Sequence, residues 1–233
     1  MDVKFLGTGG AFDYKYGNSA LWIKLNESRI LVDCGHTVYP ILRDKEMLEE
    51  IDYILVTHLH DDHVGSLCTT ILHHTFASPE PRKARIIVPN SSFEATLRAF
   101  LTLGLNDPEA YVEFIPIAEV PGLEAIDTFG LHVPDAPSFG YIFEDDHEVV
   151  AFSGDLADSE VVFYHLAYYK GKGKPIRVFH EMTFEETTTV HVYYQDLIPY
   201  MKDYEIFAYH LDPSQVPADN IIPLVYHQAH LMI

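Results

Sequence analysis

Short stretches in which hydrophobic and polar positions alternate, separated by turn residues, predict β-strands through the first half of the chain. The predicted strands are Val3–Leu6, Ser19–Leu25, Ser28–Asp33, Ile51–Val56 and Arg85–Val88. The second and third of these form a hairpin, and Gly7-Thr8-Gly9-Gly10 is a tight turn after the first. Helical spacing follows His63 and covers Ser91–Leu103, with Ser91 or Ser92 as the expected N-cap.

The second half of the chain repeats this style. Its predicted strands are Tyr111–Ile117, Glu124–Val133, Ser138–Phe143, Glu148–Phe152, Ile176–His180 and Glu205–Tyr209, and its predicted helices lie around Ser159–Tyr169 and Tyr194–Met201. No internal repeat, Ser/Gly linker or charge block divides the sequence, so we expect one domain over residues 1–233. Two sets of mostly adjacent strands with interspersed helices predict an α+β fold, with two sheets packed face to face and helices outside.

Composition narrows the class of protein. A chain of 233 residues with 48% hydrophobic and 21% charged residues can bury a core, which excludes a disordered protein. The formal net charge of −20 opposes partners held by phosphate contacts, so we expect no DNA, RNA or anionic membrane as a partner. Two cysteines, Cys34 and Cys68, make no disulfide framework. Without a signal-like or membrane-spanning stretch, we expect a soluble cytoplasmic protein.

Fourteen histidines are many for an acidic chain, and three of them gather in His58-Leu59-His60-Asp61-Asp62-His63, directly after a buried strand. Imidazole and carboxylate groups at this spacing are typical of metal ligands, and the loop could serve two adjacent ions. Zn²⁺ suits such ligands best, while Mn²⁺ and Fe²⁺ accept the same nitrogen and oxygen donors. A polar loop that is His-rich by chance is the alternative. Further ligand-type residues at predicted strand ends are His132, Asp155 and His210.

Several segments in the same order resemble one family. They are Phe5–Gly10, Ile30–Gly35, His58–His63, Pro137-Ser138-Phe139-Gly140-Tyr141, Ser153-Gly154-Asp155 and His180-Glu181-Met182-Thr183-Phe184. Together they resemble the metallo-β-lactamase superfamily, and within it the ribonuclease Z branch with its small phosphodiesterase relatives. The resemblance implies a four-layer αββα sandwich, and a supporting role for Asp33.

The resemblance also implies the ligands of two divalent ions and the catalytic groups. One ion would take His58, His60 and His132, the other Asp62, His63 and His210, with Asp155 bridging both. Asp62 and His191 are the expected catalytic residues, His191 as the general acid that protonates the leaving alkoxide. His191 is followed here by Val192-Tyr193, where ribonuclease Z has Ser-Thr. A dinuclear site supplies hydroxide near neutral pH.

Two departures from ribonuclease Z bear on the substrate. The segment between Tyr141 and Ala151 is long enough for a hairpin but not for the arm that grips tRNA, and the chain is acidic. An armless acidic member looks more like the cyclic-nucleotide phosphodiesterases of this branch, including anti-Pycsar enzymes that act on pyrimidine cyclic nucleotides. This likeness implies ring opening of a small phosphodiester, a 3′,5′-cyclic nucleotide, to a nucleoside monophosphate. It also implies a homodimer whose subunits complete each other's pockets.

Two residues are candidates for substrate contact. Tyr16, in the loop Ala11–Asn18, would stack on a base or pack the loop down, and Ser138 would contact phosphate or cap a turn. Besides the cyclic-nucleotide phosphodiesterase, the sequence is compatible with three other hypotheses about function. They are ribonuclease Z-like RNA processing, hydrolysis of a lactone or thioester, and a non-catalytic binding module on the same fold.

Overall fold

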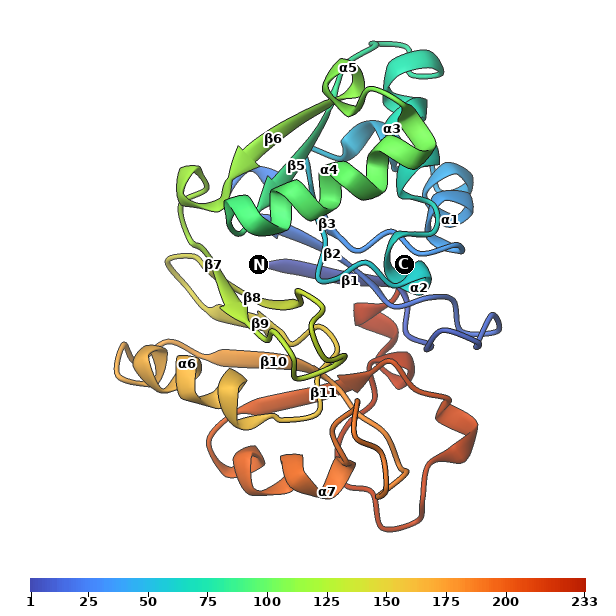
Figure 1. Cartoon of the computed structure of the whole chain (residues 1–233). Coiled ribbons are helices and arrows are strands. Elements are labelled where there is room, and N and C mark those ends of the chain that lie inside the picture. The colour runs from blue at the N-terminus through green and yellow to red at the C-terminus, as the bar shows by residue number, and fades with distance from the viewer.

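Two β-sheets face each other in the computed structural model, which describes residues 1–233, and helices cover both outer faces (Figure 1). The first sheet has the order β1-β2-β3-β4-β5-β6 and the second β11-β10-β9-β8-β7. In each sheet three neighbouring strands pair antiparallel and the rest pair parallel. The expected four-layer αββα sandwich is confirmed.

The strands of the first sheet are β1 Asp2–Gly7, β2 Ala20–Leu25, β3 Ser28–Val32, β4 Tyr53–Leu55, β5 Ala84–Val88 and β6 Val112–Pro116. Those of the second are β7 Leu123–Asp127, β8 Phe139–Glu144, β9 Val149–Phe152, β10 Ile176–Glu181 and β11 Glu205–Tyr209. All eleven overlap a strand predicted from the sequence.

The helices on the first sheet are α1 Val38–Asp44, α2 Asp61–Val64, α3 Leu67–Phe76, α4 Ser91–Leu105 and α5 Pro108–Tyr111. The second sheet carries α6 Glu160–Lys170 and α7 Tyr194–Leu197. Short 3₁₀ turns lie at Leu48–Glu50, Ile117–Glu119, Ile198–Lys202, Pro213–Gln215, Val225–His227 and Ala229–Leu231. No helix of the structure is both long and apolar enough to cross a bilayer.

Aromatic side chains hold the two sheets together. The ring of Phe5 in β1 lies 5.2 Å from that of Phe179 in β10 and 5.6 Å from that of Tyr209 in β11. Phe152 in β9 stacks on Tyr209 at 4.6 Å. Because side chains alternate between the faces of a strand, Val178 of β10 points the other way, into a second core under α6 and α7. Burial on both faces of each sheet therefore fixes the register of the strands.

Two sequence predictions about element ends were wrong. The strand predicted over Glu124–Val133 ends at Asp127, and a turn with Gly130 at φ +73° follows, so His132 lies in a loop. The cap of α4 is Asn90, whose side chain accepts a hydrogen bond from the backbone N–H of Phe93. Both differences come from polar turn residues that the apolar pattern does not register.

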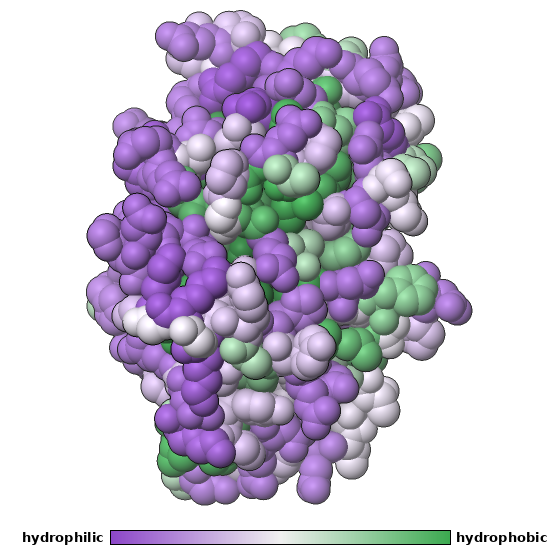
Figure 2. All heavy atoms as spheres, turned by 90° about the vertical axis from the view of Figure 1, so that its left-hand side faces the viewer, coloured by the Kyte–Doolittle hydropathy of each residue, from purple (hydrophilic) through white to green (hydrophobic).

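The side of the molecule formed by β6 and β7 is mostly hydrophilic, with an apolar area in its upper half (Figure 2). Partly buried residues of β6, β7 and the turn between them pack against the core, among them Phe114, Ile117 and Leu123. Edge strands with exposed charges such as Glu113 resist pairing with other chains.

Candidate metal centre

Ligand-type side chains from both sheets meet at one rim of the sandwich. The segment His58–His63 follows β4, and α2 begins within it at Asp61. From the second sheet come the loop after β7 with His132, the turn after β9 with Asp155, and the residue after β11, His210. The loops of the second sheet converge there because β7, β9 and β11 run in the same direction, so that their carboxyl ends lie at one edge.

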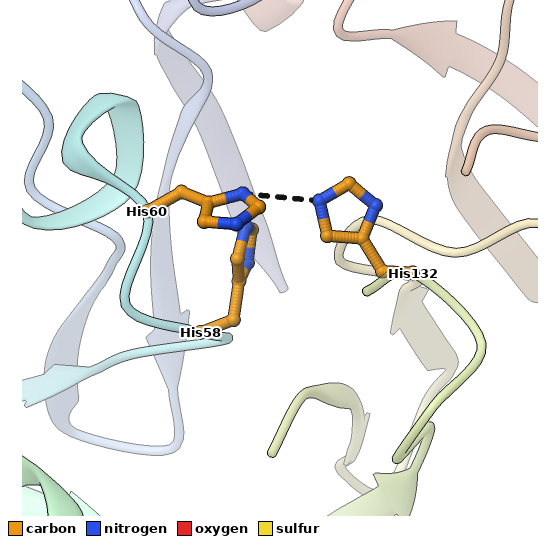
Figure 3. Close-up of side chains that lie close together, drawn as sticks. All are labelled: His58, His60 and His132. Atoms are coloured by element: carbon orange, nitrogen blue, oxygen red, sulfur yellow. Dashed lines mark hydrogen bonds between the residues drawn. The ribbon is translucent and has the colours of Figure 1, made fainter. Parts of the chain in front are cut away.

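Three histidines form the first group. His58, His60 and His132 have ring nitrogens within 4.8 Å of one another, and their rings point toward a common centre (Figure 3). His132 Nε2 lies 3.1 Å from His60 Nδ1. His132 Nδ1 donates to the carbonyl of Val190 at 2.8 Å, and His58 Nδ1 donates to Thr57 Oγ1 at 3.0 Å. These bonds leave the Nε2 lone pairs of both rings free for a cation.

The second group joins two carboxylates and two imidazoles, Asp62, His63, Asp155 and His210, within 4.8 Å. His210 Nε2 lies 3.2 Å from Asp62 Oδ2 and 3.3 Å from Asp155 Oδ2. Asp155 Oδ2 also lies 4.0 Å from His132 Nε2 in the first group. Asp155 therefore stands between the groups, as the predicted bridging ligand would.

Donor chemistry and unpaired atoms fit two divalent cations. His58 Nε2, His63 Nε2 and Asp155 Oδ1 are buried without a hydrogen-bond partner, which is costly unless another ligand completes them. Burial opposes a charge on His63, but Asp155 and Asp33 outweigh it and raise the pKa of the imidazole well above its usual value. Burial lowers the pKa of His58. The nitrogen and oxygen donors suit Zn²⁺, Mn²⁺ or Fe²⁺.

Asp33 supports the second group through a hydrogen bond to His63. Its carboxylate is fully buried and accepts from His63 Nδ1 at 2.8 Å and from the Thr57 hydroxyl and backbone N–H, both at 2.8 Å. Asp33 itself adopts a left-handed backbone conformation, φ +65°. This matches the supporting role expected from the sequence, because the bond fixes which nitrogen of His63 faces the site.

His191 lies beside both groups. Its ring centroid is 5.2 Å from that of His132 and 5.3 Å from that of His210. Nδ1 donates to Glu181 Oε2 at 3.1 Å, while Glu181 Oε1 accepts from the backbone N–H groups of Leu156 and Val192, both at 3.1 Å. Burial opposes the charged imidazole, but Glu181 outweighs burial and raises the pKa of His191 to about 9. The Glu181 carboxylate thus favours the protonated form of His191.

Two cavities adjoin the groups. The larger one, about 460 Å³, is lined by His191 and His210 with Phe12, Met182, Phe184 and Gln215. The smaller one, about 280 Å³, is lined by His58, His60 and His132 with Thr96, Pro137 and Ser138. We call them the large and the small cavity. The first group opens to the small cavity and His191 to the large one.

The two predicted substrate contacts lie in different surroundings. Ser138 borders the small cavity but is buried, and its hydroxyl donates to the carbonyl of Thr128 at 2.9 Å. The Tyr16 ring meets Tyr226 edge-on at 4.8 Å and is not among the residues that line the large cavity. Phe12, from the same loop, lines it and is 96% exposed. The aromatic content of this loop was the only sequence signal for Phe12.

The chain resembles one family of proteins along most of its length. The family described as Anti-Pycsar protein Apyc1 matches residues 1–221. The Anti-Pycsar protein Apyc1 of Bacillus phage BSP38 is 30% identical over 224 residues, which are 86% of this chain and 84% of the phage protein. That of Paenibacillus harenae is 29% identical over 210 residues, 85% of this chain and 83% of the relative.

Solved structures share the fold at low identity. The metallo-β-lactamase fold protein YhfI from Bacillus subtilis has a TM-score of 0.69 and 16% identity, covering 92% of this chain and 88% of its own. The short form of human tRNase Z has a TM-score of 0.63 and 20% identity, covering 91% of this chain and 92% of its own. The relatives and the shared fold show that the protein is a metal-dependent hydrolase, and its two groups of His and Asp side chains could hold metal. The chain belongs to the anti-Pycsar protein Apyc1 family and has the metallo-β-lactamase fold.

Proposed function

We propose that the protein is a dinuclear metal-dependent phosphodiesterase that opens 3′,5′-cyclic nucleotides, pyrimidine nucleotides among them, to nucleoside monophosphates. One observation carries this proposal. The ring of His191, hydrogen-bonded to Glu181, lies 5.2 Å from the ring of His132 and 5.3 Å from that of His210, one residue from each group. A proton donor at that position serves a reaction whose leaving group is a poor one, such as a ribose alkoxide.

The residues would divide between two ions. His58, His60 and His132 would hold one, Asp62, His63 and His210 the other, and Asp155 both, with Zn²⁺ as the first choice. Bound there, the ions would lower the pKa of a water molecule and neutralise the phosphate oxygens. Asp33 keeps the Nε2 of His63 turned toward the site by accepting a hydrogen bond from its Nδ1–H at 2.8 Å.

Asp62 and His191 would carry the proton transfers. Asp62 is 7% exposed, and its carboxylate can accept a hydrogen bond from the attacking water. His191 would give its proton to the ester oxygen that leaves, and Glu181 stabilises the imidazolium until then. The large cavity, with Phe12 and Phe184 in its wall, has room for a nucleoside beside His191.

Two other activities fit less well. In the ribonuclease Z-like alternative a long arm would grip RNA, whereas β8 and β9 are joined by the four residues Asp145–Glu148. Hydrolysis of a lactone or thioester uses the same ions. A lactone also releases an alkoxide, so only a direct comparison of substrates separates it from a cyclic phosphate.

A substrate panel tests the proposal. The metal-loaded protein is incubated with purine and pyrimidine 3′,5′-cyclic nucleotides, a precursor tRNA and a simple lactone, and the products are separated by chromatography. We expect chelator-sensitive opening of the cyclic nucleotides, with the tRNA and the lactone left intact. Cleavage of only the tRNA or only the lactone would overturn the proposal.

Asp155→Ala supplies the companion test. It removes the carboxylate between the two groups, so bound metal and activity should be lost together. Asp146→Ala changes an exposed carboxylate in the β8–β9 turn and is the matched control. Two bound ions and full activity in Asp155→Ala would contradict the bridging role.

The proposal extends to partners and location. We expect a homodimer working in the cytoplasm, with no DNA or tRNA partner, since the −20 charge repels polyanions. Light scattering of the purified protein measures the dimer directly, and a monomer at micromolar concentration would contradict it.

A further inference from the structure

Two cavities, rather than one, adjoin the ligand groups, and a cyclic mononucleotide fills only one of them. Both ester oxygens of a 3′,5′-cyclic phosphate belong to a single ribose, so the nucleoside lies on one side of the phosphorus. From the second cavity we infer that the site also takes acyclic phosphodiesters with two separate organic groups, of the dinucleotide class. This inference rests on the proposed phosphodiesterase function and deepens it.

The cavities are close enough to share one phosphate. His132 lines the small cavity and His191 the large one, and their ring centroids are 5.2 Å apart. A phosphate held by the two ligand groups would lie beside both rings. One ester oxygen would then point to the large cavity and the other to the small one.

The small cavity suits an organic group rather than a second phosphate. Its volume of about 280 Å³ is close to the lower end of small-molecule sites, about 300 Å³. Besides the histidines, its wall includes the apolar side chains of Leu59, Val133, Ala136 and Pro137. Asp135 also lines it, while no lysine or arginine does, so the wall has no counter-charge for a second phosphate and suits a neutral sugar or base.

The position of His191 sets the direction of cleavage. A water oxygen attacks the phosphorus, and the bond from phosphorus to the ester oxygen on the large-cavity side breaks, its electron pair staying on that oxygen. His191 supplies the proton that makes this oxygen an alcohol, and the proton of the attacking water passes to Asp62. The products are an alcohol in the large cavity and a phosphomonoester whose organic group occupies the small cavity.

Helix α4 offers a way to fill the small cavity without touching the ligands. Thr96 is exposed and lines the cavity, and its hydroxyl donates to the carbonyl of Ser92 at 3.1 Å. Thr102 is also exposed on α4, outside the cavity, with its hydroxyl bound to the carbonyl of Arg98 at 2.7 Å. Thr96→Trp is therefore the test variant and Thr102→Trp its matched control.

The experiment compares kcat/KM for a 3′–5′ linked deoxydinucleotide and for 3′,5′-cyclic CMP in the metal-loaded wild type and both variants, with folding checked by melting temperature. We expect the wild type to cleave both. Thr96→Trp should lower the dinucleotide value by at least about 10-fold and change the cyclic value by less than about 2-fold, since the added ring removes the space for one group. Thr102→Trp should leave both values within about 2-fold.

Other outcomes separate this inference from the proposed function. If the wild type opens cyclic CMP and leaves the dinucleotide intact, the inference is wrong and the phosphodiesterase proposal stands. If Thr96→Trp lowers both activities equally or neither, the small cavity does not hold the second group and the inference is again overturned. If protein with two bound ions cleaves neither substrate, the proposed function itself fails.

Discussion

Glu181 is a fully buried carboxylate at the end of β10, and its partners explain why it can remain there. Three donors, the backbone N–H groups of Leu156 and Val192 and the Nδ1 of His191, reach its two oxygens at 3.1 Å. A buried carboxylate without such partners would be costly. Glu181 thus fixes the orientation of His191 and favours its protonated form, which is the state that an acid needs.

The first prediction concerns this acid. His191→Ala should keep both ions, because His191 is in neither proposed ligand group, and should lower turnover of a cyclic nucleotide by about 10²- to 10⁴-fold. Turnover of an activated nitrophenyl diester should fall much less, because its leaving group needs no proton. Metal content and kcat on both substrates are measured, with the exposed His147→Ala as the control. Equal losses on both substrates would show that His191 is not the acid.

His74 leads to a prediction about acid stability. It is 2% exposed on α3, and neither ring nitrogen has a hydrogen-bond partner. Burial, helped by the nearby Arg82, lowers its pKa from 6.5 to about 4, against a weaker opposite pull from Glu49. Between pH 6.5 and about pH 4, His74 is protonated in the unfolded chain but neutral in the folded chain. A falling pH therefore favours unfolding.

The free energy of unfolding should therefore drop between pH 6.5 and pH 4 by up to about 3 kcal/mol through His74 alone, at about 1.4 kcal/mol per pH unit. His74→Leu should remove this part of the pH dependence in urea unfolding. His180, fully buried with a pKa lowered to about 4, keeps its own share. A pH profile of His74→Leu parallel to the wild type would contradict the prediction.

At the scale of elements, the turn between β9 and α6 shows how backbone geometry aims a ligand. Gly154 has φ +63°, and a Cβ there would lie 2.6 Å from the carbonyl oxygen of Phe139 and 3.3 Å from Thr57. Gly173 has a similar φ of +71° but nothing within 4 Å. A substitution at Gly173 therefore meets only the strain of the left-handed conformation, whereas one at Gly154 meets the same strain and a steric clash.

Gly154→Ala should lower the free energy of unfolding by about 1–3 kcal/mol more than Gly173→Ala does, because both bear the left-handed strain and only the first adds a clash with backbone. It should also weaken metal binding by displacing the neighbouring Asp155. Chemical denaturation and metal titration measure the two effects. Equal destabilisation by both variants would mean that the turn yields to the new methyl group.

Some elements and candidate ligands could be predicted from local sequence, whereas the placement of others depends on contacts between distant parts of the chain. His58 and His63 stand in one short segment after a buried strand, so local pattern suffices for them. His132 was expected at a strand end and lies in a loop, because the turn at Gly130 ends the strand early. Which aromatic ring of the Ala11–Asn18 loop faces a cavity depends on contacts distant in sequence, and Tyr16 meets Tyr226 instead.

At the scale of the molecule, the ligand groups join the two halves of the sandwich. The first group takes His58 and His60 from the segment after β4 and His132 from the second half of the chain. The second group likewise takes two residues, Asp62 and His63, from the first half and two, Asp155 and His210, from the second. Ions bound there would cross-link the sheets at their rim. Folding and metal binding are then one equilibrium, because the unfolded chain holds no such site.

Chelation should therefore lower the melting temperature. For each site, free metal at about 1,000 times its dissociation constant stabilises the fold by about 4 kcal/mol, which for a chain of this size is about 8–16 °C. Asp155→Asn should already melt near the chelated wild type and respond little to added EDTA, since its bridging charge is gone. Asp146→Asn, remote from the rim, should respond as the wild type does. Scanning calorimetry with and without EDTA measures all three proteins, and an unchanged wild-type melting temperature after verified metal loss would mean that the aromatic core alone holds the sheets together.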